Sequence, residues 1–213
     1  MGKITGMERK EELPPKVLQM YRAVMELIAE GEDLSAISVS TITGRAGIGK
    51  GTAYDYFDTK EEIMACALIF YMTEFSQSIR TKLFACEGFE EQINLLLDKL
   101  EEKSGKQHCF LRFVHVLTGN SEFSDLVRQK MVCPAFEQNL PLSVFGEVIE
   151  QGQRNGEIRR DLPTEYLVYA VVTRLSTYLA SIVTEECFHV DSKGLRPYIF
   201  RGILEELTVQ KKL

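Results

Sequence analysis

The stretch SVSTITGRAGIGKGTAYDYFDTK, residues 38–60, decides the fold of this chain. Its first part has the spacing of a short helix, because apolar residues recur three and four positions apart: Val39, Ile42 and Ala46. Ser38 stands just before this helix, where a serine hydroxyl caps the first turn. Gly47 and Gly49 then end it, since glycine adopts the positive φ of a helix end and can also cap the next helix.

A second short helix is predicted to begin at Lys50. Its apolar positions are Ala53, Tyr54 and Phe57, while Lys50, Thr52 and Tyr56 are expected to point elsewhere. Two helices this short do not bury enough surface to be stable alone. The chain supplies a third helix upstream, which begins at Pro14-Pro15, stops at Gly31 and has an apolar face made of Val17, Met20, Tyr21, Val24, Leu27 and Ile28.

This arrangement resembles the TetR family of bacterial transcriptional regulators. The family's pattern, V-x-x-I-A-x-x-A-G-V-S-x-G-T-x-Y-x-Y-F-x-S-K-E-E-L, is matched here by Val39, Ile42, Ala46-Gly47-Ile48, Lys50-Gly51-Thr52, Tyr54, Tyr56-Phe57 and Lys60-Glu61-Glu62-Ile63. The match covers about a quarter of the chain with many fixed spacings. The resemblance implies a three-helix head that places its third helix in the major groove of DNA, and a helical body that binds an effector and forms a homodimer.

The residues expected to contact DNA lie on the two short helices and just after them. They are Ser40, Thr41, Arg45, Lys50, Gly51, Thr52, Tyr54, Tyr56 and Lys60. Lys50 and Thr52 are the candidates for base edges, because lysine donates to guanine and the threonine methyl can meet a thymine methyl. Gly51 would let the backbone approach the groove, and the other side chains can donate to phosphates. Two alternatives stay open: the ring of Tyr54 in the core, and Lys60 as a solvated helix end.

Asp55 departs from the basic or polar residue that the family usually has at this position. A carboxylate repels phosphates, so Asp55 either turns away from DNA or restricts the site to particular contacts. The charge balance raises the same question, because residues 1–60 hold 8 basic and 9 acidic residues and the whole chain has a net charge of -6. DNA affinity must therefore come from a few well-placed groups and from dimerisation.

The glycine-rich turn also has a second interpretation. Residues 44–52, GRAGIGKGT, look like the phosphate loop of a nucleotide-binding kinase, and ISVSTIT before them could be a strand. Such a loop needs parallel strands around it and a magnesium-binding Asp at the end of one strand. Downstream of Thr52 the spacing is helical and no second β-branched apolar run follows, so this alternative is disfavoured. A helical interaction module that no longer reads DNA is a third interpretation.

The composition is that of an ordinary soluble protein, with 213 residues that are 45% hydrophobic and 26% charged. The first 12 residues are charged and lack the apolar core of a signal peptide. The longest apolar run, residues 166–183, is interrupted by Thr173, Arg174, Ser176 and Thr177, so a buried helix explains it better than a membrane span. We expect a cytoplasmic protein that is not an enzyme, needs no cofactor and does not enter a membrane.

Downstream of residue 58 the chain reads as a series of helices. We place the boundary between a DNA-binding domain, residues 1–58, and an effector-binding and dimerisation domain, residues 59–213, at this point. Thr59 and Glu62 have the spacing of a capping box that opens a long helix ending near Phe84. Further helices are predicted over residues 89–103, 107–117, 122–132, 135–156, 165–186 and 195–209. The predicted fold class is all-α.

The last two long helices carry wide apolar faces. Their residues are Leu167, Val171, Leu175, Tyr178, Leu179 and Ile182, then Ile199, Ile203, Leu204 and Leu207. Pairing of such faces across a two-fold axis would give a four-helix dimer interface, which the resemblance also implies. The alternative is an internal core, and the sequence leaves both open.

An effector cavity in the second domain could use several aromatic and polarisable side chains. The candidates are Phe75, Phe110, Phe113, His115, Met131, Phe136 and Tyr169, each of which is also an ordinary core residue. His108 and His115 share a helical face, but two ligands without a third make a weak site, so we expect no metal. The five cysteines, Cys66, Cys86, Cys109, Cys133 and Cys187, are widely spaced and lack a C-x-x-C pair, as is typical of a reducing cytosol.

These patterns together predict a homodimeric, ligand-responsive DNA-binding regulator. We expect it to act as a repressor that binds a palindromic double-stranded DNA operator and is released when a small-molecule effector binds the body. The sequence does not identify the effector.

Overall fold

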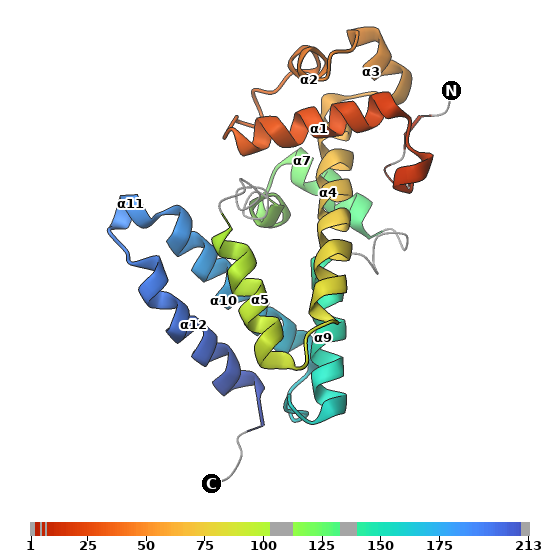
Figure 1. The fold of residues 1–213 in the computed structure, drawn as a ribbon. Helices are drawn as coiled ribbons and strands as arrows, with labels where there is room; N and C mark the ends of the chain where they lie inside the picture. The colour runs from red at the N-terminus through yellow and green to blue at the C-terminus, as the bar shows by residue number, and fades with distance from the viewer. Residues whose placement is uncertain (1–2, 5, 7, 103–112, 133–139, 210–213) are drawn as a thin grey trace. The chain divides into compact units, whose positions relative to one another are not determined.

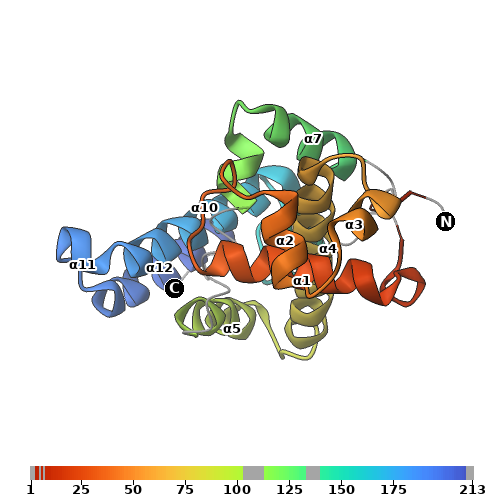
Figure 2. The same ribbon diagram turned by 90° about the horizontal axis from the view of Figure 1, so that it is seen from above.

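A computed structural model describes residues 3, 4, 6, 8–102, 113–132 and 140–209. Within these residues the regular structure is helical, and the only β pairing is an isolated bridge between Ile158 and Thr208. The helices, shown in Figures 1 and 2, are η1 (Lys10–Glu12), α1 (Pro15–Ala29), α2 (Val39–Arg45), α3 (Lys50–Tyr56), α4 (Lys60–Leu83), α5 (Phe89–Glu101), α7 (Glu122–Met131), α9 (Pro141–Asn155), α10 (Thr164–Val183), α11 (Glu185–Phe188) and α12 (Ser192–Leu207). The all-α prediction is confirmed.

The chain forms two compact units. The first unit combines residues 1–75 with residues 108–139, and the second combines residues 76–107 with residues 140–213. The division falls inside α4, so this one helix contributes to both units. The domain boundary expected at residue 58 stays a prediction.

The head, which we define as α1, α2 and α3, is part of the first unit. All six apolar residues predicted for α1 are buried, and Pro15 occupies the first turn of that helix, as expected. The Tyr21 ring lies 6.2 Å from the ring of Phe57 and 5.4 Å from that of Phe70, which joins α1 to the end of α3 and to α4. Helix α2 packs on α1 and on α3, so three short helices bury one common core.

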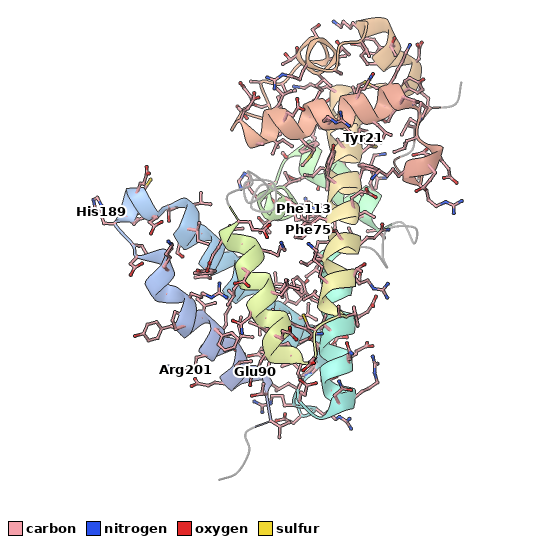
Figure 3. All side chains as sticks on the ribbon, viewed as in Figure 1. Tyr21, Phe75, Glu90, Phe113, His189 and Arg201 are labelled. Carbon is pink, nitrogen blue, oxygen red and sulfur yellow. The ribbon has the colours of Figure 1, made fainter. Side chains whose placement is uncertain are left out.

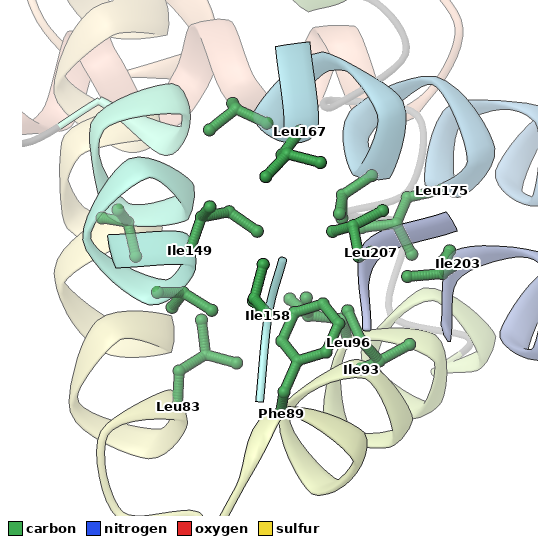
Figure 4. Packing of buried hydrophobic residues seen from close by; sticks show 14 of the residues in the cluster. Leu83, Phe89, Ile93, Leu96, Ile149, Ile158, Leu167, Leu175, Ile203 and Leu207 are labelled. Carbon is green, nitrogen blue, oxygen red and sulfur yellow. The ribbon is translucent and has the colours of Figure 1, made fainter. Parts of the chain in front are cut away.

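The second unit is built around α10, which packs against α12, α9 and α5 (Figure 4). The residues Leu167, Val171, Leu175, Tyr178, Ile203 and Leu207 are all buried in this core, and Ile182, Ile199 and Leu204 pack against it. Leu179 is buried as well. The chain itself thus covers the buried residues of these faces, as the internal-core alternative expects, and Ile182, Ile199 and Leu204 are only partly covered. A dimer through the same two helices would use the side chains that they leave exposed.

The remaining helix predictions need small corrections. Helix α10 ends at Val183 and a separate turn, α11, follows it, whereas one helix was expected to reach residue 186. Helix α12 begins at Ser192, three residues before the predicted start at residue 195, because the Asp191 carboxylate accepts a hydrogen bond from the amide of Gly194 over 3.0 Å. Helix α10 has the length and mean hydropathy, 1.4, of a membrane span, but it is the central helix of the second unit's core, and 39% of its apolar window is buried.

Candidate DNA-binding surface

The turn between α2 and α3 has the predicted construction. The Ser38 hydroxyl accepts a hydrogen bond from the amide of Thr41 over 3.1 Å and so caps α2. Gly47 has a φ of 67°, a left-handed conformation that strains residues with a Cβ atom, and Gly49 is the N-cap of α3. Because ISVSTIT contributes to a capped helix rather than to a strand, the phosphate-loop alternative fails.

The two short helices are held by buried side chains, Thr43 and Tyr56 among them, and leave most of the residues expected to contact DNA outside. Ile42 on α2 and Ala53 on α3 are almost completely buried. The expected DNA contacts Ser40, Thr41, Arg45, Lys50, Gly51 and Tyr54 are exposed, and Thr52 is half-buried. The buried positions fix both helices and, apart from Tyr56, leave the expected DNA contacts of α2 and α3 at least partly exposed.

The two tyrosines of α3 have exchanged roles relative to the prediction. Tyr56, expected outside, is only 4% exposed, whereas Tyr54, expected on the apolar face, is 47% exposed. The reason is helical spacing, because Ala53, Tyr56 and Phe57 stand at i, i+3 and i+4 and form the tighter apolar stripe. The alternative with the Tyr54 ring in the core is wrong, and a phosphate contact by Tyr56 would have to use a largely buried side chain.

Arg45 is already paired in this structure. Its guanidinium donates to both carboxylate oxygens of Glu30, over 2.6 and 2.8 Å, and lies 3.8 Å from Glu26. The hydrogen bonds to Glu30 and the charge of that carboxylate raise the pKa of Arg45, and the same pairing lowers the pKa of Glu30. No feature of the sequence pattern around residues 38–60 indicated this partner.

Lys60 also has partners within the head. Its ammonium donates to the backbone oxygens of Ser35 and Ile37 over 2.8 and 2.9 Å, and so fixes the loop before α2. The alternative of a merely solvated helix end is therefore wrong. Helix α4 is capped as predicted at Thr59, whose hydroxyl accepts from the amide of Glu62 over 3.1 Å, while Glu62 reaches back to the amide of Asp58.

An unpredicted contact comes from the amino-terminal segment. The Lys3 ammonium donates to the backbone oxygens of Tyr54 and Phe57, over 2.7 and 3.2 Å, and pairs with Asp58 over 2.7 Å. A cation at this end of α3 satisfies carbonyl groups that have no partner within the helix and opposes the negative end of the helix dipole. Sequence reasoning missed this contact because more than 50 residues separate the partners.

Lys50 differs from these cations. Within the part of the chain that the structure describes, its exposed ammonium has no hydrogen-bond or ion-pair partner. Gly51, the next residue, would have nothing within 4 Å of an added Cβ atom, so no packing inside the chain requires glycine there. A glycine inside a helix costs about 0.5–1 kcal/mol relative to alanine. The first two positions of α3 thus keep an open surface that internal stability does not explain.

The candidate effector residues do not form one group. Figure 3 labels Phe75, which ends the first unit's part of α4 and is 38% exposed, and Phe113, which is 3% exposed. His115 and Met131 belong to the same unit as these two, with His115 exposed and Met131 half-buried. Tyr169 belongs to the second unit and is 61% exposed. Phe110 and Phe136 lie outside the described residues, as does His108.

Within the described ranges, no three histidine, cysteine, aspartate or glutamate side chains lie close enough together to bind a metal ion. Burial raises the pKa of Cys66 against the opposing charge of Lys130, and burial together with the charge of Glu91 raises the pKa of Cys86. Both shifts disfavour the thiolate, which is the reactive form of cysteine. Cys109 and Cys133 lie outside the described residues.

Helices α10 and α12 keep a second set of large side chains on the outside. Tyr169 on α10 is 61% exposed, and Tyr198 on α12 is 69% exposed. Both residues lie outside the buried rows of their helices. Tyr166 and Val183 on α10 and Leu195 on α12 are exposed as well. Large exposed apolar side chains on neighbouring helices are typical of surfaces that associate with another protein.

Comparisons with known proteins agree with this geometry. Residues 21–66 match the family model of bacterial regulatory proteins, tetR family. The chain is 25% identical over 150 residues to the fatty acid metabolism regulator protein of Bacillus subtilis, a match that covers 70% of this chain and 73% of the relative.

Solved structures with the same fold include two related regulators. The fatty acid degradation regulator FadR of Bacillus halodurans has a TM-score of 0.69 at 21% identity, with 90% of this chain and 96% of that chain covered. The regulator FadR of B. subtilis, in complex with stearoyl-CoA, has a TM-score of 0.67 at 19% identity, with 88% and 97% covered. At these identities the structural matches establish the fold.

Proposed function

We propose that this chain, whose residues 21–66 match the tetR family model, is a homodimeric DNA-binding repressor whose effector is a long-chain acyl-CoA thioester. The class of effector is supported by the names of two relatives, the B. subtilis fatty acid metabolism regulator and the FadR structure that holds stearoyl-CoA. The proposed role requires no catalysis.

The open start of α3 carries the DNA-binding part of the proposal. Among the described residues, Lys50 has no hydrogen-bond or ion-pair partner, and none lies within 4 Å of a Cβ atom added at Gly51. Both features are expected of a helix whose first turn enters a major groove, since lysine donates to guanine and the missing Cβ atom lets the backbone approach. Thr52 can then contact a thymine methyl.

The phosphate contacts are proposed for the surrounding groups. Ser40, Thr41 and Tyr54 are exposed and carry hydroxyls that can donate to phosphate oxygens. Arg45 and Lys60 can contribute charge, but each must exchange or share the partners described above. Asp55 is exposed on α3, so its carboxylate disfavours phosphate positions near it and narrows the set of acceptable contacts.

The effector part of the proposal rests on population shift. An acyl-CoA that prefers the released arrangement of the two heads by roughly 100-fold would contribute about 2.7 kcal/mol per site. The acyl chain needs apolar side chains, and Phe75, Phe113 and Met131 of the first unit remain our candidates for it. Dimerisation through exposed residues of α10 and α12 would set the distance between the heads.

The DNA test uses the purified full-length chain and double-stranded DNA from upstream of its own coding sequence. We expect binding that weakens with salt, and a loss of about 1–3 kcal/mol per half-site in the Lys50→Ala variant. Gly51→Ala should weaken DNA binding while the free protein becomes more stable, because alanine favours the helix and meets nothing inside the chain. Salt-independent binding, or no effect of Lys50→Ala, would instead favour a helical module that does not read DNA.

The effector test adds stearoyl-CoA to the preformed DNA complex. We expect dissociation of the complex, with free CoA and stearate as controls that each lack half of the ligand. Full DNA binding that resists stearoyl-CoA would contradict the effector assignment and leave the DNA assignment intact.

A further inference from the structure

Arg45 and Glu30 form a bidentate ion pair on the surface of the head. Two parallel hydrogen bonds of 2.6 and 2.8 Å join the guanidinium on the last turn of α2 to the carboxylate just after α1. Such bidentate pairing uses the planar fork of arginine and leaves it less free to bind another anion. The same fork is the group that arginine uses to bind phosphate.

The position of Glu30 is unfavourable for the helix that it follows. Glu30 is the C-cap of α1, and Glu26 stands in the last turn, which contains no basic residue. Carboxylates at this end oppose the helix dipole. Helix stability therefore does not explain why two carboxylates are placed here, and both lie against Arg45.

The three cations of residues 38–60 are engaged to different degrees. Lys50 has no partner within the described residues, and the Lys60 ammonium donates to backbone oxygens, 3.8 Å from the nearest Glu61 oxygen. Arg45 is the one among these three that donates two hydrogen bonds to a single carboxylate, that of Glu30. In the free protein, one of the few charges available for DNA is thus neutralised internally.

We propose that Glu30 competes with an operator phosphate for Arg45 and thereby limits the affinity of the protein for DNA. The proposal rests on the DNA-binding function proposed above. On binding, the guanidinium exchanges the Glu30 carboxylate for a phosphate, and the released carboxylate then lies close to the DNA backbone and repels it. Glu30 is therefore an affinity-setting residue that does not itself contact DNA.

The expected size follows from the strength of exposed ion pairs. Release of Arg45 should raise affinity by about 2- to 5-fold per protomer, so a dimer that engages two half-sites would gain about 4- to 25-fold. The salt dependence should change as well. In the wild type, the Glu30 carboxylate that Arg45 leaves takes up a cation from solution, which offsets part of the cation release from DNA. Without this carboxylate, the slope of log K against log salt should steepen by up to roughly one per protomer.

The experiment measures DNA affinity by fluorescence anisotropy, across a salt series, for the full-length wild type, Glu30→Gln, Arg45→Gln and the double variant. We expect Glu30→Gln to bind more tightly and with a steeper slope, and this gain to vanish in the Arg45→Gln background. Glu11→Gln is the charge control, since it removes one exposed carboxylate of η1 that takes no part in the pair. It should give a smaller gain.

Three results would overturn the proposal. If the wild type still bound DNA, the proposed function would stand without it. The three results are unchanged or weaker binding by Glu30→Gln, a gain that persists without Arg45, and a gain equalled by Glu11→Gln. Thermal unfolding of each variant separates a folding defect from the effect, because a destabilised head would bind less tightly rather than more.

Discussion

The head and the second unit are both built from amphipathic helices, but their apolar surfaces are used differently. In α1, α2 and α3 one face of each helix is apolar and the chain itself covers it. In α10 and α12 one row is buried in the chain's own core, whereas another keeps large side chains such as Tyr169 and Tyr198 exposed. Periodicity therefore identifies the partner of a one-sided helix, and for a two-sided helix it leaves the partner of each side undetermined.

The largest effect is expected from replacing the exposed aromatic residues of α10 and α12. The double variant Tyr169→Asp and Tyr198→Asp should convert the dimer to a monomer, because charges replace apolar side chains at a surface that must be dry. Loss of paired heads should lower operator affinity by roughly 10²- to 10⁴-fold.

Sedimentation and anisotropy check both results. The helical circular dichroism should stay near that of the wild type, because the replaced side chains lie outside the core. A dimer that survives the double substitution would place the interface elsewhere.

A smaller effect is expected from the buried row of the same helix. Leu175 is 4% exposed within the core of the second unit, so Leu175→Ala should lower the free energy of unfolding by about 2–5 kcal/mol. Thr173→Ala, on the exposed side of α10, is the matched control and should change it by less than about 0.5 kcal/mol. Chemical denaturation gives the difference. If Leu175→Ala instead changed the dimerisation constant and left unfolding unaffected, this row would belong to the interface after all.

The smallest effects separate two glycines of the head. Gly47 has a φ of 67°, so Gly47→Ala should destabilise the head by about 1–2 kcal/mol. Gly51 has no neighbour within 4 Å of an added Cβ atom, so Gly51→Ala should stabilise it by about 0.5–1 kcal/mol. If Gly47→Ala lowers the thermal unfolding temperature and Gly51→Ala raises it, then Gly47 is needed for the turn and Gly51 is not needed for folding. Equal signs would contradict the distinction.

Local rules predicted the head well because its decisive features are short-range. Ser38, Gly47 and Gly49 act on residues a few positions away, and all three were found in the predicted roles. The exchange of Tyr54 and Tyr56 marks the limit of such rules, since both residues fit an approximate helical stripe and only the packing distinguishes them.

Contacts between distant segments could not be predicted in the same way. Lys3 meets α3 and Glu30 meets Arg45 because folding brings separate elements together, and neither sequence neighbourhood indicates the partner. The sequence left open what covers the buried row of α10 for a related reason. Leucine at helical spacing looks the same whether its cover comes from the same chain or from another copy.

The composition of α10 has a consequence for the newly made protein. Helix α10 is as apolar as a membrane span, and the core of the second unit covers one of its sides. In the proposed dimer, a second protein molecule would cover the exposed row. At low protein concentration the monomer takes longer to dimerise, and its aromatic row stays accessible to chaperones and proteases for that time. The amount of working repressor should thus fall more steeply than its rate of translation, and genes under its control would respond to scarcity with a threshold.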